Sequence, residues 1–284
     1  MSDRLVLLGT KGGPSVRTGG PSPSASLLQV GGKPYVIDCG LGVTRGFVEA
    51  GLHLSQLNTI FLTHHHSDHT LEFGALVHTA WTTGLKQNVK AFGPPGTVAL
   101  WRAFVEMMAI DIRTRIVDEG RPEIVSLCEV ADFECMLSYA DGTVRVDALR
   151  VEHPPMTDTF ALRFRFNGKT IVFSADTCFF PPLAEFARDA DVLVHEAMHV
   201  PGIDALLGKI ENAGPGLRTH MFASHTPAED VGRLAAMAGV KHLVLNHFVP
   251  SADMGSLPEH YEAAVRTGFP GRLTIGRDGL EIPL

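Results

Sequence analysis

The stretch Thr63-His64-His65-His66-Ser67-Asp68-His69 decides how this chain is interpreted. It places potential metal-binding side chains at positions 64, 66, 68 and 69, directly after the apolar segment 59–63, which is typical of a buried strand. Unpartnered buried polar groups cost roughly 1–3 kcal/mol each, and a bound cation removes that cost. The cluster therefore predicts a metal site at a strand end rather than a solvated turn rich in histidine.

The composition is that of a globular protein with a sizeable core. The chain has 284 residues, of which 45% are hydrophobic and 19% charged. We expect a single domain over residues 1–284. The net charge of −7 is unlike the basic excess of most nucleic-acid-binding proteins, so the sequence predicts that nucleic acid is an unlikely partner.

Two further features bear on the location of the protein. The four cysteines have no zinc-finger or redox spacing, which is typical of free thiols in a reducing compartment. The apolar run at the N-terminus is too short for a signal peptide, and no run approaches the roughly 18 apolar residues of a membrane-spanning helix. We expect a cytoplasmic protein with no membrane partner.

Apolar strand patterns alternate with helical patterns along the chain, which predicts the α/β class. We expect helices over 43–50, 68–81, 98–108 and 227–238, a glycine-rich loop over 9–26, and no clear pattern over 111–129. Strands are expected over 5–8, 26–30, 35–37, 60–63, 89–92, 144–151, 159–166, 170–173, 191–194 and 242–245. Five polar residues stand within three positions after the ends of such strands: His64, His153, Asp176, Glu196 and His247. Because sites in layered α/β proteins form at the carboxyl ends of strands, we expect these side chains to meet.

The pattern His64-x-His66-x-Asp68-His69, followed by His153, Asp176 and His247, resembles the metallo-β-lactamase superfamily. Within it the chain is most similar to the RNase Z-like and arylsulfatase-like hydrolases. The segments that carry this likeness are 8–10, 37–40, 174–177 and 224–230. The resemblance implies a four-layer αββα sandwich with two metal ions at one edge.

The same resemblance implies the ligands. His64, His66 and His153 would bind the first ion, Asp68, His69 and His247 the second, and Asp176 both. Two divalent ions about 3.5–4 Å apart can hold a hydroxide between them as the nucleophile. We expect zinc, because the set is rich in imidazole, while Mn²⁺ or Fe²⁺ stays open because of the carboxylates. Ala175 stands where relatives commonly have glycine, a change that should not affect ligation.

Three residues outside the ligand set receive functional hypotheses. His225 resembles the general acid of RNase Z-like enzymes, although it also stands just before the expected helix 227–238 and could be structural. Glu196 either orients His225 or is a solvated carboxylate. Asp38 is either a plain turn residue after a strand or, as the resemblance implies, lies beneath the metal-binding loop and accepts hydrogen bonds from it. His65, His195, His199 and Cys178 are expected to be structural or surface residues.

The main functional hypothesis is a dinuclear metal-dependent hydrolase that cleaves a small ester-like bond: a carboxyl ester, a lactone or an aryl sulfate. His225, Asp68 and Glu196 would be its catalytic residues. A small molecule would bind under the 9–26 loop and near region 104–115, although region 104–115 could equally be an ordinary helix and surface turn. A phosphodiesterase or tRNA 3′-processing endonuclease of the RNase Z type is the alternative. The 23 positions from His153 to Asp176 leave no room for the tRNA-binding arm of the best-known members, which counts against tRNA.

Two other classes are disfavoured by the motif. Diiron oxidoreductases of this fold carry an acidic residue where His66 stands. A non-catalytic metal-binding protein would be expected to lack a ligand or the acid, and all are present here. The resemblance also leaves a homodimer open.

Overall fold

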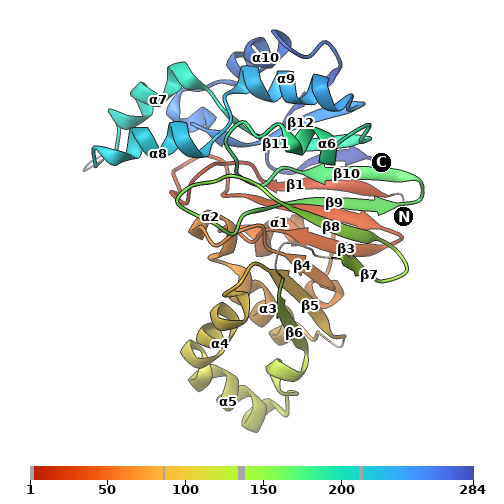
Figure 1. Cartoon of the computed structure of the whole chain (residues 1–284). Coiled ribbons are helices and arrows are strands. Elements are labelled where there is room, and N and C mark those ends of the chain that lie inside the picture. The colour runs from red at the N-terminus through yellow and green to blue at the C-terminus, as the bar shows by residue number, and fades with distance from the viewer. Residues whose placement is uncertain (1–2, 86, 134–137, 211–213) are drawn as a thin grey trace.

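Two seven-stranded sheets are stacked face to face in the computed structural model, which describes residues 3–85, 87–133, 138–210 and 214–284. Helices cover the outer face of each sheet, so the order of layers is helix, sheet, sheet, helix (Figure 1). The predicted αββα sandwich is therefore confirmed. No helix among these residues is long and apolar enough to cross a membrane.

The first sheet has the order β14-β1-β2-β3-β4-β5-β6. Its antiparallel part runs from β14 to β3, and its parallel part runs from β3 to β6. The strands are β1 (Arg4–Gly9), β2 (Ala25–Val30), β3 (Lys33–Ile37), β4 (Thr59–Phe61), β5 (Val89–Gly93), β6 (Cys128–Asp132) and β14 (Leu280–Pro283).

The second sheet repeats this plan with the order β13-β12-β11-β10-β9-β8-β7. Strands β10 to β13 are parallel, and β7 to β10 are antiparallel. The strands are β7 (Ser138–Ala140), β8 (Arg145–Arg150), β9 (Phe160–Phe166), β10 (Lys169–Phe173), β11 (Val192–Met198), β12 (His242–Val249) and β13 (Arg272–Ile275).

The helices fall into three groups in space (Figure 1). Beside the first sheet lie α1 (Val43–Glu49), α2 (Ser67–Thr70), α3 (Phe73–Thr82), α4 (Thr97–Met107) and α5 (Ala109–Glu119). Over the second sheet lie α6 (Pro182–Phe186), α9 (Ala228–Ala238) and α10 (Pro258–Arg266). At one end stand α7 (Val200–Leu207) and α8 (Gly216–Ser224). Short 3-10 turns are η1 (Leu54–Gln56), η2 (Ile124–Ser126) and η3 (Ala252–Met254).

Aromatic side chains pack between the two sheets near the end of β4. Phe61 of β4 and Phe164 of β9 meet edge to face, with ring centroids 5.3 Å apart, and both are fully buried. Strands such as β1 and β2 bury side chains on both faces because each lies between a sheet and a helix layer. The end of β4, which precedes the histidine run, is thus fixed against the second sheet.

The strands lie close to their predicted positions, but several elements were missed. Region 111–129, which showed no clear pattern, contains most of α5 and the start of β6. No pattern indicated α7, α8 or α10, or the edge strands β7, β13 and β14. Strands β11 and β12 also continue through Glu196 and His247, past their predicted ends at residues 194 and 245.

One glycine links the fold to the histidine run. A Cβ atom on Gly40 would lie 2.3 Å from the carbonyl oxygen of Asp68 and 2.8 Å from the carbonyl carbon of Pro23. Both are backbone atoms, which cannot move aside as the end of a flexible side chain can. The loop that carries Asp68 therefore depends on the missing side chain at position 40.

Gly40→Ala is expected to lower the free energy of unfolding by about 1–3 kcal/mol, because the backbone around Asp68 must shift. Thermal or urea denaturation of the metal-free protein measures this effect without any contribution from bound ions. Gly216→Ala is the matched control, because a Cβ there meets nothing within 4 Å. Equal stability of the two variants would contradict the predicted close contact.

Candidate metal centre

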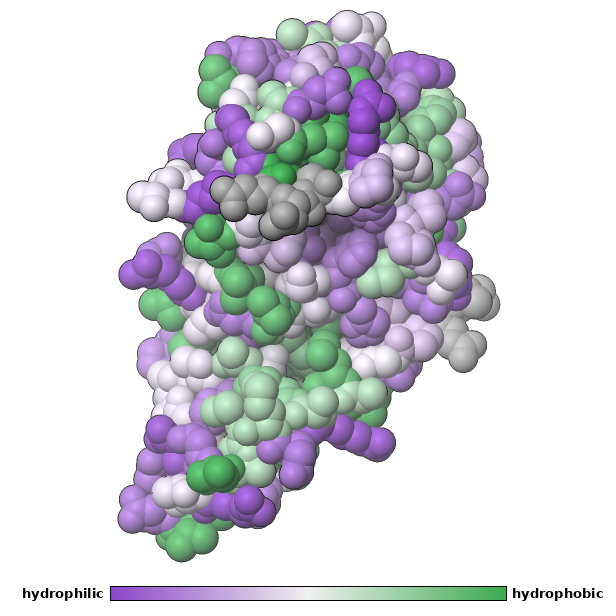
Figure 2. Space-filling model, turned by 90° about the vertical axis from the view of Figure 1, so that its left-hand side faces the viewer, coloured by the Kyte–Doolittle hydropathy of each residue, from purple (hydrophilic) through white to green (hydrophobic). Residues whose placement is uncertain are grey.

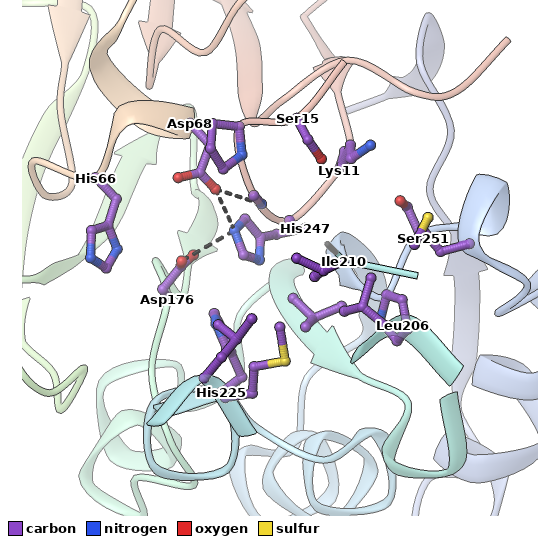
Figure 3. Close-up of a pocket in the computed structure, with 18 of the residues that line it drawn as sticks. Lys11, Ser15, His66, Asp68, Asp176, Leu206, Ile210, His225, His247 and Ser251 are labelled. Atoms are coloured by element: carbon purple, nitrogen blue, oxygen red, sulfur yellow. Dashed lines mark hydrogen bonds and ion pairs between the residues drawn. The ribbon is translucent and has the colours of Figure 1, made fainter. Parts of the chain in front are cut away.

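The segments that follow β4, β8 and β10, together with His247 of β12, meet at one edge of the sandwich (Figure 3). In the first group of side chains, Nε2 of His64 lies 3.1 Å and Nε2 of His153 lies 3.0 Å from Nδ1 of His66. Asp176 Oδ2 lies 3.7 Å from His64 Nε2 and 3.8 Å from His153 Nε2. These are the residues that the resemblance assigned to the first ion.

A second group lies on the other side of Asp176. Asp176 Oδ1 is 3.4 Å from His69 Nε2, and its Oδ2 is 3.1 Å from His247 Nε2. Asp68 Oδ2 lies 3.3 Å from His247 Nε2 and 3.6 Å from His69 Nε2. All seven residues of the expected ligand set are thus brought together in two groups that share Asp176.

The donor atoms fit two divalent ions. Within each group they lie within 4.8 Å of one another. His69 Nε2 and Asp176 Oδ1 are buried without a hydrogen bond to any described residue, an arrangement that costs free energy unless a cation is bound. Three imidazole nitrogens facing one another at about 3 Å point to the same conclusion. Imidazole and carboxylate donors suit zinc and also accept manganese or iron.

Side chains and backbone around the groups fix the donor atoms. Asp38 accepts hydrogen bonds from His69 Nδ1 at 2.8 Å and from the backbone N–H and hydroxyl of Thr63 at 2.8 and 3.0 Å. His153 Nδ1 donates to the carbonyl oxygen of Ser224 at 2.8 Å. These bonds leave Nε2 of both histidines directed at the centre. Asp38 therefore lies beneath the metal-binding loop, as the resemblance implied.

The backbone is left-handed at three residues of this edge. Asp38, Ala175 and His247 have φ values of 63°, 56° and 44°. A non-glycine residue in this region costs about 1–2 kcal/mol, and such strain gathers at functional sites. At His247 the pairing of β11 with β12 shifts register, since Glu196 faces Asn246 and Ala197 faces Phe248. His247 is the extra residue of a β-bulge, which explains why β12 continues past it.

Burial and nearby carboxylates shift the pKa values of the histidines in opposite directions in the two groups. Burial lowers the pKa of His64 well below its ordinary value, and that of His153 to about 4. Burial also acts against charge on His69 and His247, but the Asp176 carboxylate raises the pKa of His69 well above its ordinary value and that of His247 to about 10. The first group therefore offers neutral imidazoles, whereas the second holds protons that a metal ion must displace.

His225 stands beside both groups. Its Nδ1 lies 2.9 Å from Glu196 Oε2, and its ring centroid is 5.5 Å from that of His247 and 5.2 Å from that of His153. Burial opposes charge on His225, yet the Glu196 carboxylate raises its pKa above the ordinary value. Glu196 is 2% exposed and accepts the backbone N–H of Thr177 at 2.6 Å, so it orients His225 rather than lying in solvent.

A cleft of about 400 Å³ opens in front of the metal centre. The 11–17 part of the glycine-rich loop lines one side, as predicted, with Lys11 and Arg17 as its cations. Figure 3 shows Leu206 and Ile210 across the cavity from His66. They belong to an apolar wall from α7, α8 and their neighbours, which the sequence analysis missed because no strand-end or motif signal marks it: Leu206, Ile210, Leu217, Met221, Val249 and Met254.

The expected contribution of region 104–115 to the cleft was wrong. None of its residues lines the cavity, because α4 and α5 extend from the first sheet away from the edge where the ligands meet (Figure 1). Met107 and Ile110 are 70% and 80% exposed. Figure 2 shows apolar side chains on this lower part of the molecule.

The remaining histidines and Cys178 lie outside the two groups. His195 is buried and its Nδ1 donates to the Glu196 carbonyl oxygen at 2.7 Å. His199 pairs with Ser256 at 3.0 Å, and His65 Nε2 lies 3.3 Å from the Pro94 carbonyl oxygen. Cys178 is partly buried with its sulfur 3.7 Å from a Glu152 oxygen.

The family model described as Anti-Pycsar protein Apyc1 matches residues 4–245. The chain belongs to this family. It is also 30% identical to a protein named Ribonuclease Z from Mycobacterium marinum, with 96% of each chain covered. A second Ribonuclease Z, from Mycobacterium sp. strain KMS, is 30% identical, with 96% of this chain and 93% of the relative covered. The resemblance to RNase Z-like metallo-β-lactamase hydrolases is confirmed, and the chain is a metal-dependent hydrolase.

Solved structures agree on the fold. The metallo-β-lactamase fold protein YhfI from Bacillus subtilis superimposes with a TM-score of 0.72 at 20% identity and 99% coverage of both chains. The short form of human tRNase Z gives a TM-score of 0.68 at 19% identity and 98% coverage of both. At these identities the likeness establishes the αββα sandwich.

Loading the metal-free protein with zinc at pH 7.5 is expected to release about two protons from the second group, because His69 and His247 are protonated there before a metal ion binds. Calorimetric titration in buffers of different ionisation enthalpy measures this release. Binding whose heat is the same in every buffer would contradict the predicted protonation.

Proposed function

We propose that the chain is a phosphodiesterase that hydrolyses a nucleotide phosphodiester at this centre. His225, held protonated by Glu196 beside both ligand groups, is the observation that carries the proposal. An alkoxide leaving group needs a proton, whereas the phenolate of an aryl sulfate needs little help. The arrangement thus favours alkyl esters over aryl sulfates, and the relatives favour phosphodiesters among them.

The Ribonuclease Z relatives count against the expectation that nucleic acid is an unlikely substrate. The alignment with the Mycobacterium marinum protein spans 284 positions and 96% of each chain, which leaves room for only short insertions in either. The short interval between His153 and Asp176, occupied by β9 and β10, therefore does not separate this chain from that relative. The net charge is no obstacle either, because Lys11 and Arg17 line the cleft.

The size of the cleft favours a substrate portion of about one nucleotide. About 400 Å³ lies within the range of small-molecule sites. Its apolar wall, with Leu206 and Ile210, offers a surface for a base or another apolar group. Lys11 and Arg17 both approach Asp253 Oδ2, at 3.1 and 3.3 Å, so two cations share one carboxylate and the cluster keeps a positive excess that attracts an anion.

The contacts of each residue indicate its role in the proposed reaction. When bound, the two divalent ions would supply an activated water and charge stabilisation for the phosphoryl group. Each ion would be held by one of two groups of residues that share Asp176. The first group is His64, His66 and His153, and the second is Asp68, His69 and His247. Glu196 fixes the proton on His225 Nδ1, so that Nε2 of the imidazolium donates to the departing oxygen. Gly13 N–H donates to Asp68 Oδ2 at 2.7 Å and thereby ties the loop to the centre.

A substrate panel tests the proposal. The zinc-loaded protein is assayed with a 3′-extended tRNA, a dinucleoside monophosphate, a cyclic mononucleotide, bis-p-nitrophenyl phosphate, an aryl sulfate, a lactone and a carboxyl ester. Hydrolysis of phosphodiesters, lost in Asp68→Ala together with bound metal, is the expected result. Turnover of only the sulfate, the lactone or the carboxyl ester would refute the proposal and restore the ester hypothesis.

His225→Ala is expected to slow phosphodiesters with alkoxide leaving groups by about 10²- to 10⁴-fold, the usual contribution of a general acid. The same variant should slow bis-p-nitrophenyl phosphate far less, because nitrophenolate leaves without a proton. Steady-state kinetics on both substrates measures the ratio, and His53→Gln, at an exposed histidine away from the cleft, is the control. Equal losses on the two substrates would remove the general-acid role of His225.

A further inference from the structure

One histidine outside every motif considered so far faces the metal centre. His220 lies on α8, lines the cleft and is partly exposed. Its ring centroid is 6.2 Å from that of His66, 6.1 Å from that of His153 and 6.3 Å from that of His225. It belongs to neither group of donor atoms. The imidazole thus stands over the first group and the acid without being part of either.

The contacts of Ser224 determine which nitrogen of His220 carries the proton. The Ser224 hydroxyl donates its only hydrogen to the carbonyl oxygen of Pro154, at 2.5 Å. The same oxygen lies 3.1 Å from His220 Nδ1 and has only lone pairs left to offer. His220 Nδ1 must therefore be the donor. In the neutral ring, Nε2 is then an unprotonated acceptor.

His220 lines the cleft and is partly exposed, so a bound substrate can reach its ring. Across the parts of the chain that the structure describes, the His220 ring contacts Ser224 Oγ through Nδ1 and also interacts with the backbone of Pro154, on the same side as Ser224. The nearby imidazoles of His66 and His153 direct their own lone pairs at the first group. A partner for Nε2 must therefore come from the substrate or from solvent.

The chemistry of a nucleotide limits which of its groups can donate a hydrogen bond to His220 Nε2. Phosphate oxygens of a diester and the ring oxygen of the sugar carry no proton, so a lone pair on Nε2 does not attract them. The 2′-hydroxyl of a ribose is a donor, and it stands on the carbon next to the one that carries the scissile 3′-phosphate. A site built to bond a hydroxyl rejects the analogue that lacks it, because the acceptor is left unpaired.

We propose that His220 is a specificity-determining residue whose Nε2 accepts a hydrogen bond from the ribose 2′-hydroxyl beside the scissile phosphate, so that the enzyme selects ribonucleotide over 2′-deoxyribonucleotide phosphodiesters. The inference rests on the proposed phosphodiesterase function. It assigns His220 no part in metal binding, and substitutions there leave the bound metal unchanged.

Two amide substitutions separate this role from a structural one. In His220→Asn the amide takes the place of Nδ1 and keeps the bond to Ser224, but nothing reaches the position of Nε2. In His220→Gln the longer side chain can present its carbonyl oxygen near the position of Nε2. His220→Ala removes both groups. His53→Ala is the matched control, because His53 Nδ1 also lies 2.7 Å from a serine hydroxyl, in Ser55, but on the exposed surface away from the cleft.

The test compares kcat/KM for ribose and 2′-deoxyribose forms of two probes, uridylyl-uridine and uridine 3′,5′-cyclic phosphate, with zinc content and bis-p-nitrophenyl phosphate turnover measured in parallel. The zinc-loaded wild type should prefer the ribose form by roughly three- to tenfold, the worth of one neutral hydrogen bond. His220→Ala and His220→Asn should lose that preference by slowing only the ribose form, His220→Gln should recover part of it, and His53→Ala should keep it.

The outcomes distinguish the two proposals. A wild type that hydrolyses no phosphodiester refutes the proposed function. A wild type that hydrolyses them while His220→Asn keeps the ribose preference, or slows both sugar forms equally, refutes the role of His220 alone. Loss of zinc in His220→Asn would likewise overturn it, by making His220 part of the metal centre.

Discussion

The arrangement of the metal centre depends on the buried carboxylate of Asp176. It is 2% exposed and lies between two clusters of imidazoles, one supplied mainly by the first sheet and one that includes β12 of the second. A buried carboxylate needs charge and hydrogen-bond partners on every side. The sandwich brings imidazoles to it by ending strands of both sheets at the same edge, with Phe61 and Phe164 packed between the sheets. Asp176 Oδ1 still lacks a hydrogen bond to any described residue, which is the need that a bound cation would meet.

The backbone at this edge adopts conformations that cost free energy but place the side chains of the site. Asp38, Ala175 and His247 all adopt left-handed conformations, and His247 does so as the extra residue of a bulge. The bulge turns His247 toward Asp176, and the turn at Asp38 places its carboxylate against Thr63 and His69. Ala175 stands in one of them, where glycine would adopt the same conformation without steric cost. The αββα frame thus stores strain where the chemistry is proposed to occur.

Much of this was predictable from the sequence, for a physical reason. Ligands at fixed short spacing after an apolar strand leave a pattern that survives without any coordinates, and so His64 to His69 could be interpreted as a metal site from the residues alone. The resemblance to the metallo-β-lactamase superfamily added His153, Asp176 and His247 to the expected ligands. The bulge at His247 left no such pattern, because it arises from pairing between β11 and β12. The cleft wall from α7 and α8, including His220, was also missed, since tertiary packing alone brings those helices to the site.

One hypothesis was wrong, and one expectation is disfavoured by the Ribonuclease Z relatives, for the same reason. Region 104–115 was expected to contact substrate because of its apolar and basic side chains, but α4 and α5 carry them away from the edge. The net charge of −7 was taken to disfavour nucleic acid, yet Lys11 and Arg17 lie at the cleft. Composition describes the whole chain, whereas binding depends on the few groups that the fold places around one cavity.

The central claim is that two divalent ions share Asp176. Anomalous diffraction from crystals of the zinc-loaded protein tests it most directly. The account predicts two zinc peaks about 3.5–4 Å apart, one among His64, His66 and His153 and the other among Asp68, His69 and His247, with Asp176 between them. A single peak, or zinc bound anywhere else under saturating metal, would contradict it.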